Sequence, residues 1–209
     1  MTDIDPLPPA PHHRRHWLEY VATGAALLLS AVSLWVAIGT MDANNKMVAA
    51  ASWPFLQIDT SDGLPDGTEV MRFDVSNAGV GPAIVQTFET QLDGKPVKSS
   101  AELLARCCGF DPKKPRPVIV NQPQIGSWTT GTIAQSVIRA GEMREFFRLV
   151  KTDKNDRTYQ ILKKAVAERR LLARACWCSV FNECWQGSFI GLKAERVDTC
   201  PVPAVPYSQ

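Results

Sequence analysis

One stretch of this sequence is apolar without interruption. Residues 21–41 carry no charged side chain and are bracketed by Glu19 and Asp42. At about 1.5 Å of rise per residue, a helix of this length spans about 31 Å, which matches the hydrocarbon core of a bilayer. The stretch therefore predicts one transmembrane helix. A buried core helix seldom runs this far without a charge, and the apolar region of a cleaved signal peptide is shorter.

The flanks of this stretch predict its orientation. Arg14 and Arg15 precede it, whereas Lys46 is the one basic residue among residues 42–52. Cytoplasmic flanks of membrane helices are enriched in Lys and Arg. We therefore expect a plasma (inner) membrane protein with residues 1–20 as a disordered, proline-containing cytoplasmic tail. Residues 42–52 are predicted as a connector, and residues 53–209 as an extracytoplasmic, periplasmic domain.

The pattern beyond the connector is mostly that of strands. Within residues 69–76, apolar residues at 71, 73 and 75 alternate with charged residues at 72 and 74. This alternation is typical of a strand with one buried face. Further strands are predicted at 53–59, 84–92, 133–139, 143–150, 171–180 and 184–190.

Two segments have helical patterns instead. Ser99 and Glu102 have the spacing of a capping box, and Gly109 is placed to end the short helix that would follow. Residues 157–169 carry an apolar stripe at helical spacing. Residues 109–131 are predicted as a long loop. The sum is a mainly β domain with one or two helices and a proline-rich C-terminal tail, for which we predict an immunoglobulin-like two-layer sandwich.

Composition and charge narrow the class of protein. The chain has 209 residues, enough for one domain with an appendage, and its formal net charge is +2. A balance so close to neutral argues against nucleic acid as a partner.

The distribution of histidine limits the chemistry of the outer domain. All three histidines lie at positions 12, 13 and 16 of the N-terminal tail, so the outer domain has none. It therefore has neither a Ser-His or Cys-His relay nor a histidine-ligated metal. No pair of carboxylates has a spacing that singles it out for catalysis. We predict a protein without catalytic residues, cofactor or metal.

Six cysteines lie beyond the apolar stretch, and an even number on the oxidising side of a membrane predicts structural disulfides. Two of them, Cys176 and Cys178, lie two apart on a strand and share a face, so they are poorly placed to bond each other. Cys178 and Cys184 would be opposed if the turn centres on Phe181. The sequence leaves 15 pairings open among the six residues, Cys107, Cys108, Cys176, Cys178, Cys184 and Cys200.

Two other interpretations of the cysteines compete with structural bridges. A zinc site made of cysteines needs paired C-x-x-C spacings, and a thioredoxin-like redox site needs one C-x-x-C opening a helix. The sequence has neither. A thiol-disulfide or metal-handling protein that uses Cys176, Cys178 and Cys184 is therefore the alternative hypothesis.

Three segments carry a resemblance. Ser52-Trp53-Pro54, N-A-G-V-G-P-A at 77–83 and C-W-C-S-V-F-N-E-C-W at 176–185 follow a single N-terminal membrane helix. In this order the chain resembles a group of uncharacterised bacterial single-pass, membrane-anchored proteins with a periplasmic, cysteine-containing domain. The resemblance implies a bacterial inner membrane and no known activity, so it carries over no catalytic residues.

The favoured hypothesis is a non-enzymatic interaction or scaffold module, held at the periplasmic face by its helix. Its expected partners are the lipid bilayer and another envelope protein, and the sequence leaves its oligomeric state open. Aromatic residues near the cysteine hairpin are the candidates for contact, although such residues belong more often to a core: Trp177, Phe181 and Trp185.

Overall fold

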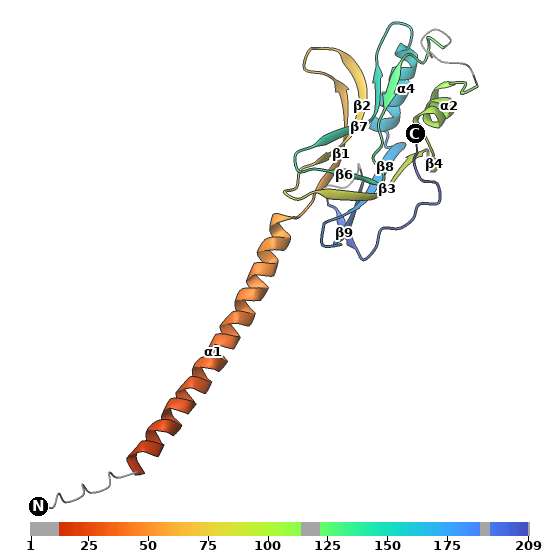
Figure 1. Ribbon diagram of the computed structural model, residues 1–209. Helices are drawn as coiled ribbons and strands as arrows, with labels where there is room; N and C mark the ends of the chain where they lie inside the picture. The colour runs from red at the N-terminus through yellow and green to blue at the C-terminus, as the bar shows by residue number, and fades with distance from the viewer. Residues whose placement is uncertain (1–12, 114–121, 189–192, 209) are drawn as a thin grey trace, which may run out of the picture. The chain divides into compact units, whose positions relative to one another are not determined.

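The structure is a computed structural model that describes residues 13–113, 122–188 and 193–208 (Figure 1). The chain divides into two compact units, Met1–Val48 and Ala49–Gln209.

The described residues of the first unit all belong to one helix, α1 (His13–Ala51), whose last three residues are counted with the second unit. Its most apolar part has a mean hydropathy of 2.1, and none of that part is buried. The hydroxyl groups of Thr23, Ser30 and Thr40 each donate to the carbonyl four residues earlier, at 2.8 Å. These three hydroxyl groups are thus hydrogen-bonded within the helix itself. The prediction of one N-terminal helix long and apolar enough to cross a membrane is confirmed.

The helix is longer than the predicted span of 21–41. Residues 13–20 are helical, which departs from the predicted disordered tail over 1–20, while residues 1–12 lie outside the described residues. The connector predicted at 42–52 is helical as far as Ala51. Once a helix has nucleated, each further residue adds one hydrogen bond at little cost. The helix therefore extends into polar flanks that contain no proline or glycine.

The second unit contains two antiparallel sheets. The first has the order β1 (Leu56–Gly63), β2 (Glu69–Asn77), β7 (Met143–Val150) and β5 (Trp128–Thr130). The second has the order β10 (Glu195–Val197), β9 (Cys184–Ser188), β8 (Leu171–Cys178), β3 (Ala83–Leu92) and β4 (Lys95–Val97). Strand β6 (Ser136–Ile138) pairs with the first residues of β3. The prediction of a mainly β domain is confirmed.

Aromatic rings from both sheets meet in one core. The ring of Phe146 on β7 lies 5.7 Å from Phe73 on β2 and 4.8 Å from Phe88 on β3, measured between centroids. Helix α4 (Asp156–Ala167) contacts both β2 and β8, and helix α2 (Ser100–Cys108) packs against α4. The buried side chains of Tyr159 and Leu162 attach α4 to this core.

Local sequence signals are accurate at α2. The side chain of Ser99 accepts a hydrogen bond from the backbone N of Glu102 at 3.3 Å, as a capping residue does. The Glu102 carboxylate accepts from the backbone N of Lys98 at 2.9 Å. Gly109 ends the helix with φ of 74°, a left-handed conformation that glycine adopts without strain.

Three predicted segments differ from the structure. The strand expected at 133–139 is limited to β6, because Ser136 Oγ donates to the carbonyl of Ile133 and makes a turn there. Strand β5 falls in the region predicted as loop, and β10 lies between the predicted hairpin and the start of the predicted tail at Val197. The predicted end of the last hairpin, residues 189–190, lies outside the described residues. Within the long loop, Ile125 is fully buried, so this part covers the core.

The turn at 77–82 holds the start of β1 in place. Asn77 is buried and accepts hydrogen bonds from the backbone N of Phe55 (3.2 Å) and Gly79 (3.0 Å). A Cβ atom on Gly81 would lie 1.9 Å from the carbonyl oxygen of Ser52, so no other residue fits there without a shift of backbone. The residues that carry the resemblance in this segment therefore have a packing role.

Candidate functional site

The hairpin of β8 and β9 places two cysteines opposite each other. Its register pairs Cys178 with Cys184, and a disulfide joins them, with Cα atoms 4.0 Å apart. The turn is stabilised by Ser179, whose Oγ accepts from the backbone N of Phe181 at 3.1 Å. The predicted opposition of the two cysteines is confirmed.

A second disulfide ties the C-terminal tail to the hairpin. Cys176, on the same strand as Cys178, bonds to Cys200, with Cα atoms 5.6 Å apart. As expected from their spacing, Cys176 and Cys178 do not bond each other. The Sγ atoms of Cys178 and Cys200 lie 3.9 Å apart, so the two bridges are in contact.

The third disulfide joins the neighbours Cys107 and Cys108 at the end of α2. No cysteine of the chain is left as a free thiol. A bridge between neighbours closes almost no loop, so it adds little by constraining the unfolded chain.

The tail beyond Cys200 forms a strap, defined here as residues 201–206, which includes three prolines. Its far end is fixed by Tyr207, whose backbone N donates to the carbonyl of Phe88 at 3.1 Å. The Tyr207 ring is buried against Phe88 and Phe146. Its hydroxyl lies 2.5 Å from Ser100 Oγ, and burial raises the pKa of this phenol. The strap is therefore held at both ends.

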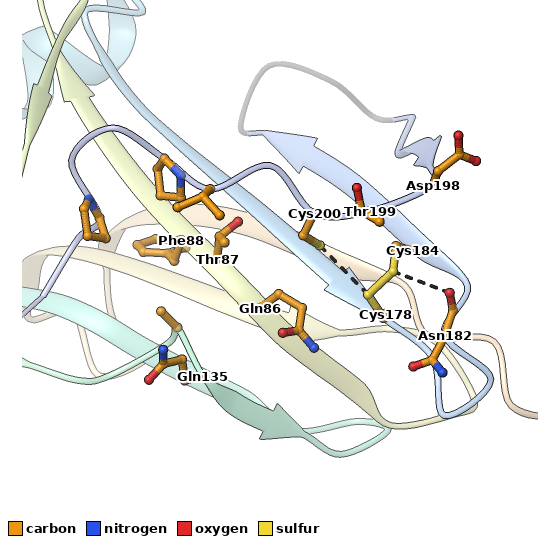
Figure 2. Close-up of a pocket in the computed structure, with 14 residues that line it drawn as sticks. Gln86, Thr87, Phe88, Gln135, Cys178, Asn182, Cys184, Asp198, Thr199 and Cys200 are labelled. Carbon is orange, nitrogen blue, oxygen red and sulfur yellow. Dashed lines mark hydrogen bonds between the residues drawn. A yellow bond between two sulfur atoms is a disulfide. The ribbon is translucent and has the colours of Figure 1, made fainter.

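A groove of about 620 Å³ lies between the strap, strand β3 and the hairpin (Figure 2). It runs along the part of β3 between Val85, where pairing with β6 ends, and Thr90, where pairing with β4 begins, and within this part Tyr207 N already donates to the carbonyl of Phe88. The walls are formed by residues from β3, the segment before β6, the hairpin and the tail: Gln86, Thr87, Phe88, Ala134, Gln135, Cys178, Asn182, Cys184, Asp198, Thr199, Cys200, Val202, Pro203 and Pro206.

The chemistry of these walls is largely uncharged. Side-chain amides and hydroxyls supply hydrogen-bonding groups, proline, valine and disulfide sulfur supply apolar surface, and Asp198 is the one ionisable side chain among them. Such a surface suits a ligand that offers both hydrogen bonds and apolar contact, and it does not favour a highly charged one.

Two wall residues have a strained backbone. Gln135 has φ of 55° and Asn182 has φ of 59°, within the left-handed region that glutamine rarely adopts and that asparagine adopts more readily in turns. They are two of the four non-glycine residues with positive φ in the described part of the chain. Such strain costs about 1 kcal/mol or more and tends to gather at ligand-binding sites.

The three aromatic residues predicted as contacts lie in different environments. Trp177 is fully buried, and its indole N–H donates to the carbonyl of Pro54 at 3.4 Å, so it belongs to the core. Trp185 is partly buried, whereas Phe181, at the hairpin tip, is 52% exposed. Of the three, Phe181 is the one whose ring is presented to solvent.

A metal ion would need thiolates that this hairpin does not offer in its bridged state. The sulfur atoms of Cys178, Cys184 and Cys200 lie within 4.8 Å of one another. All three are bonded in disulfides, and a cysteine binds metal as the thiolate. Metal binding here would first require both bridges to be reduced.

Sequence reasoning found the cysteines of this site but missed the groove. The strap, its anchor Tyr207 and the wall residues Gln86 and Gln135 were not singled out. The one sequence signal for a tail that is fixed at both ends is the set of prolines between Cys200 and Tyr207. The pairing of β3 with β6 and β4, which leaves part of its edge without a partner strand, depends on residues far apart in the sequence. No local sequence pattern predicts it.

No protein-family model matches this chain. No curated protein and no solved structure is similar enough to it to count as a match.

Proposed function

We propose that this protein is a membrane-anchored binding module without catalytic activity, and that its groove holds an extended segment of another envelope protein. The observation that carries this proposal is the groove itself, which runs along an open stretch of β3 beneath a strap held at both ends. Helix α1 serves as the anchor.

Three observations support the proposed location. The apolar helix lies at the N-terminal end, and Arg14 and Arg15 on its N-terminal flank favour a cytoplasmic N-terminus. All six cysteines lie beyond the helix and are paired in disulfides, as expected of a domain in an oxidising compartment. We therefore place the second unit in the periplasm of a bacterium and the helix in its inner membrane.

We further infer that the domain is an immunoglobulin-like sandwich. Such domains have one sheet in the order A-B-E-D and another in the order G-F-C, with an added C′ strand in some members. Reading β1, β2, β7 and β5 as A, B, E and D reproduces the first order. Reading β9, β8, β3 and β4 as G, F, C and C′ reproduces the second. Strands β6 and β10 and helices α2 and α4 are additions to that plan.

The proposed occupant follows from the edge that the groove exposes. A peptide that adds to a sheet edge gains affinity from backbone hydrogen bonds and specificity from side-chain pockets. The chain's own tail already uses this edge, because Tyr207 N donates to the carbonyl of Phe88. The amide and hydroxyl groups of the walls can meet backbone groups of a second extended segment. Asp198 favours a partner with a basic side chain at that end of the groove.

Site-specific photo-crosslinking in native membranes tests this proposal. A photoreactive benzoylphenylalanine replaces Gln86 or Gln135 in the groove, and Lys154, exposed in the segment between β7 and α4, serves as the matched control. We expect both groove positions to crosslink to one and the same partner protein, through a short contiguous segment mapped by mass spectrometry. We expect the control position not to reach that segment. Equal crosslinking at all three positions, or none in the groove, would contradict the proposal.

A further inference from the structure

The two bridges at the hairpin lie close enough to exchange partners. Cys178 is bonded to Cys184, yet its Sγ lies 3.9 Å from Sγ of Cys200, which is bonded to Cys176. The sulfurs of Cys178, Cys184 and Cys200 are all within 4.8 Å of one another. Disulfides exchange when a thiolate attacks a disulfide sulfur, so two bridges in contact need only one thiolate to begin.

The sulfurs are also reachable from the groove. Cys178, Cys184 and Cys200 line it, although Cys178 and Cys184 are each only 6% exposed (Figure 2). A thiol that enters the groove therefore meets the Cys178–Cys184 bridge beside Cys200. The third bridge, Cys107–Cys108, lies at the end of α2 and does not line the groove.

We propose that the two bridges form a thiol-disulfide relay, in which a dithiol that attacks Cys184 passes its reduction through Cys178 to the Cys176–Cys200 bridge. The substrate class is a reduced dithiol, small or carried by a protein. The relay is a stoichiometric exchange at the same groove, not catalysis, because each chain gives up one bridge, and the exchange is independent of whether a peptide binds there.

The steps balance as follows in atoms and electrons. One thiolate of the dithiol attacks Sγ of Cys184, forms a mixed disulfide and releases Cys178 as a thiolate. The Cys178 thiolate attacks Sγ of Cys200, forms a Cys178–Cys200 bridge and releases Cys176 as a thiolate that takes up a proton. The second thiol of the dithiol then attacks its own mixed disulfide, which releases Cys184 as a thiol and oxidises the dithiol to a disulfide. The protein gains two electrons and two protons and keeps one bridge.

The exchange changes where the strap is attached to β8. Cys176 and Cys178 are two residues apart on this strand, so the attachment point moves along it by about 6.6 Å, whereas Sγ of Cys200 has to close only the 3.9 Å that separates it from Sγ of Cys178. The strap forms one wall of the groove, so we expect its shape to depend on which bridge is present. This last consequence rests on the proposed function, whereas the exchange does not.

Limited reduction of the full chain in detergent micelles tests the relay. The protein is treated with less than one equivalent of dithiothreitol, and its thiols are alkylated in acid. Cleavage after Trp177 and Phe181 by chymotrypsin separates Cys176, Cys178 and Cys184 into different peptides, so mass spectrometry can identify each bridge. Among molecules that keep Cys107–Cys108 and are reduced once at the hairpin, we expect most to contain a Cys178–Cys200 bridge with Cys176 and Cys184 alkylated.

Two other products would overturn the proposal. One is a chain that keeps Cys176–Cys200 while Cys178 and Cys184 are both alkylated, which is simple reduction without transfer. The other is a chain that keeps Cys178–Cys184 while Cys176 and Cys200 are alkylated. A result of either kind leaves the crosslinking test of the groove unaffected, so the two proposals fail separately.

A variant provides a second measurement that needs no reductant. In Cys184→Ser, Cys178 has no partner on β9, and we expect it to compete with Cys176 for Cys200, giving a mixture of two bridges. The double variant Cys107→Ser, Cys108→Ser is the matched control, since it removes a bridge away from the groove and should leave Cys176–Cys200 and Cys178–Cys184 intact. A Cys184→Ser chain that holds Cys176–Cys200 alone, with Cys178 free, would count against the relay.

Discussion

At the scale of single residues, Asn77 bears the largest number of buried polar contacts in the turn before β3. Its side-chain amide donates to the carbonyls of Gly81 (2.8 Å) and Ile138 (2.9 Å), and its side-chain oxygen accepts from two backbone N–H groups. It thereby joins the start of β1, the turn itself and the end of β6. An amide is needed because the site requires a donor and an acceptor in one short side chain.

We expect Asn77→Ala to lower the free energy of unfolding by about 3 kcal/mol, because each buried group left without a partner costs about 1–3 kcal/mol. Asn77→Asp keeps the acceptor and loses the donors, so it should also be destabilising. The measurement is chemical unfolding of the full chain in detergent, followed by tryptophan fluorescence. A loss below about 1 kcal/mol for Asn77→Ala would show that water replaces these bonds.

A second residue, Asp74, gives a prediction about pH. It is buried on β2, and this burial raises the pKa of its carboxyl group, an effect that the nearby carboxylates of Asp59 and Glu145 increase and Arg72 opposes. Arg72 Nε lies 2.9 Å from the Asp74 carboxylate. The folded state therefore binds a proton at Asp74 more tightly than the unfolded state, whose carboxyl titrates near about 3.9.

The sign of the pH effect follows from this difference. As pH rises from about 4 through the raised pKa, the folded state loses a proton that the unfolded state has already lost, so stability falls. Asp74→Asn removes this loss. We expect the variant to gain more stability over the original chain at pH 7 than at pH 4, measured by unfolding at both values. A gain that is the same at both, or larger at pH 4, would contradict the raised pKa.

At the scale of elements, the two hairpin bridges should contribute unequally to stability. Cys176–Cys200 spans 24 residues of sequence and Cys178–Cys184 spans 6. Loop-closure entropy gives about 3.4 kcal/mol for the longer loop and about 2.2 kcal/mol for the shorter one.

We therefore expect the double variant Cys176→Ser, Cys200→Ser to lose about 1 kcal/mol more than Cys178→Ser, Cys184→Ser. The comparison uses thermal and chemical unfolding, with Cys107→Ser, Cys108→Ser as a reference that should change least. The reverse order would mean that the short bridge holds the hairpin by more than loop closure.

Elements with strong local signals could be predicted from the sequence, and those that depend on distant partners could not. The capping residue Ser99 and the terminating Gly109 mark α2, and apolar residues that alternate with charged ones over 71–75 mark β2, although the strand buries residues of both faces. Strands β5 and β10 have three residues each and exist because longer strands pair with them. The groove depends on where β6 and β4 leave β3 unpaired, which no local pattern encodes.

The cysteines illustrate the same limit. The opposition of Cys178 and Cys184 follows from a short turn and was predictable. The partner of Cys176 lies beyond another strand, so its bond to Cys200 required the fold. The bridge between Cys107 and Cys108 was among the open pairings, and nothing in the structure gives it a role in the groove.

At the scale of the whole molecule, the proposal joins an anchor to a binding surface. The helix supplies a span suited to a bilayer, and the second unit supplies a core of two sheets with bridges beside the groove. The disulfides beside the groove depend on the orientation of the helix in the membrane. Disulfides persist on the oxidising side of a membrane, so the orientation of the helix decides whether the strap remains tethered.

This dependence makes the state of the six thiols in intact cells the most direct test. Cells are quenched in acid, free thiols are blocked with N-ethylmaleimide, and the protein is then reduced and labelled with a second, heavier maleimide. We expect all six cysteines to carry the second label, as they do when bridged until reduction. More than two cysteines per chain carrying the first label would contradict the account, because the domain would then face the cytosol or keep its thiols free.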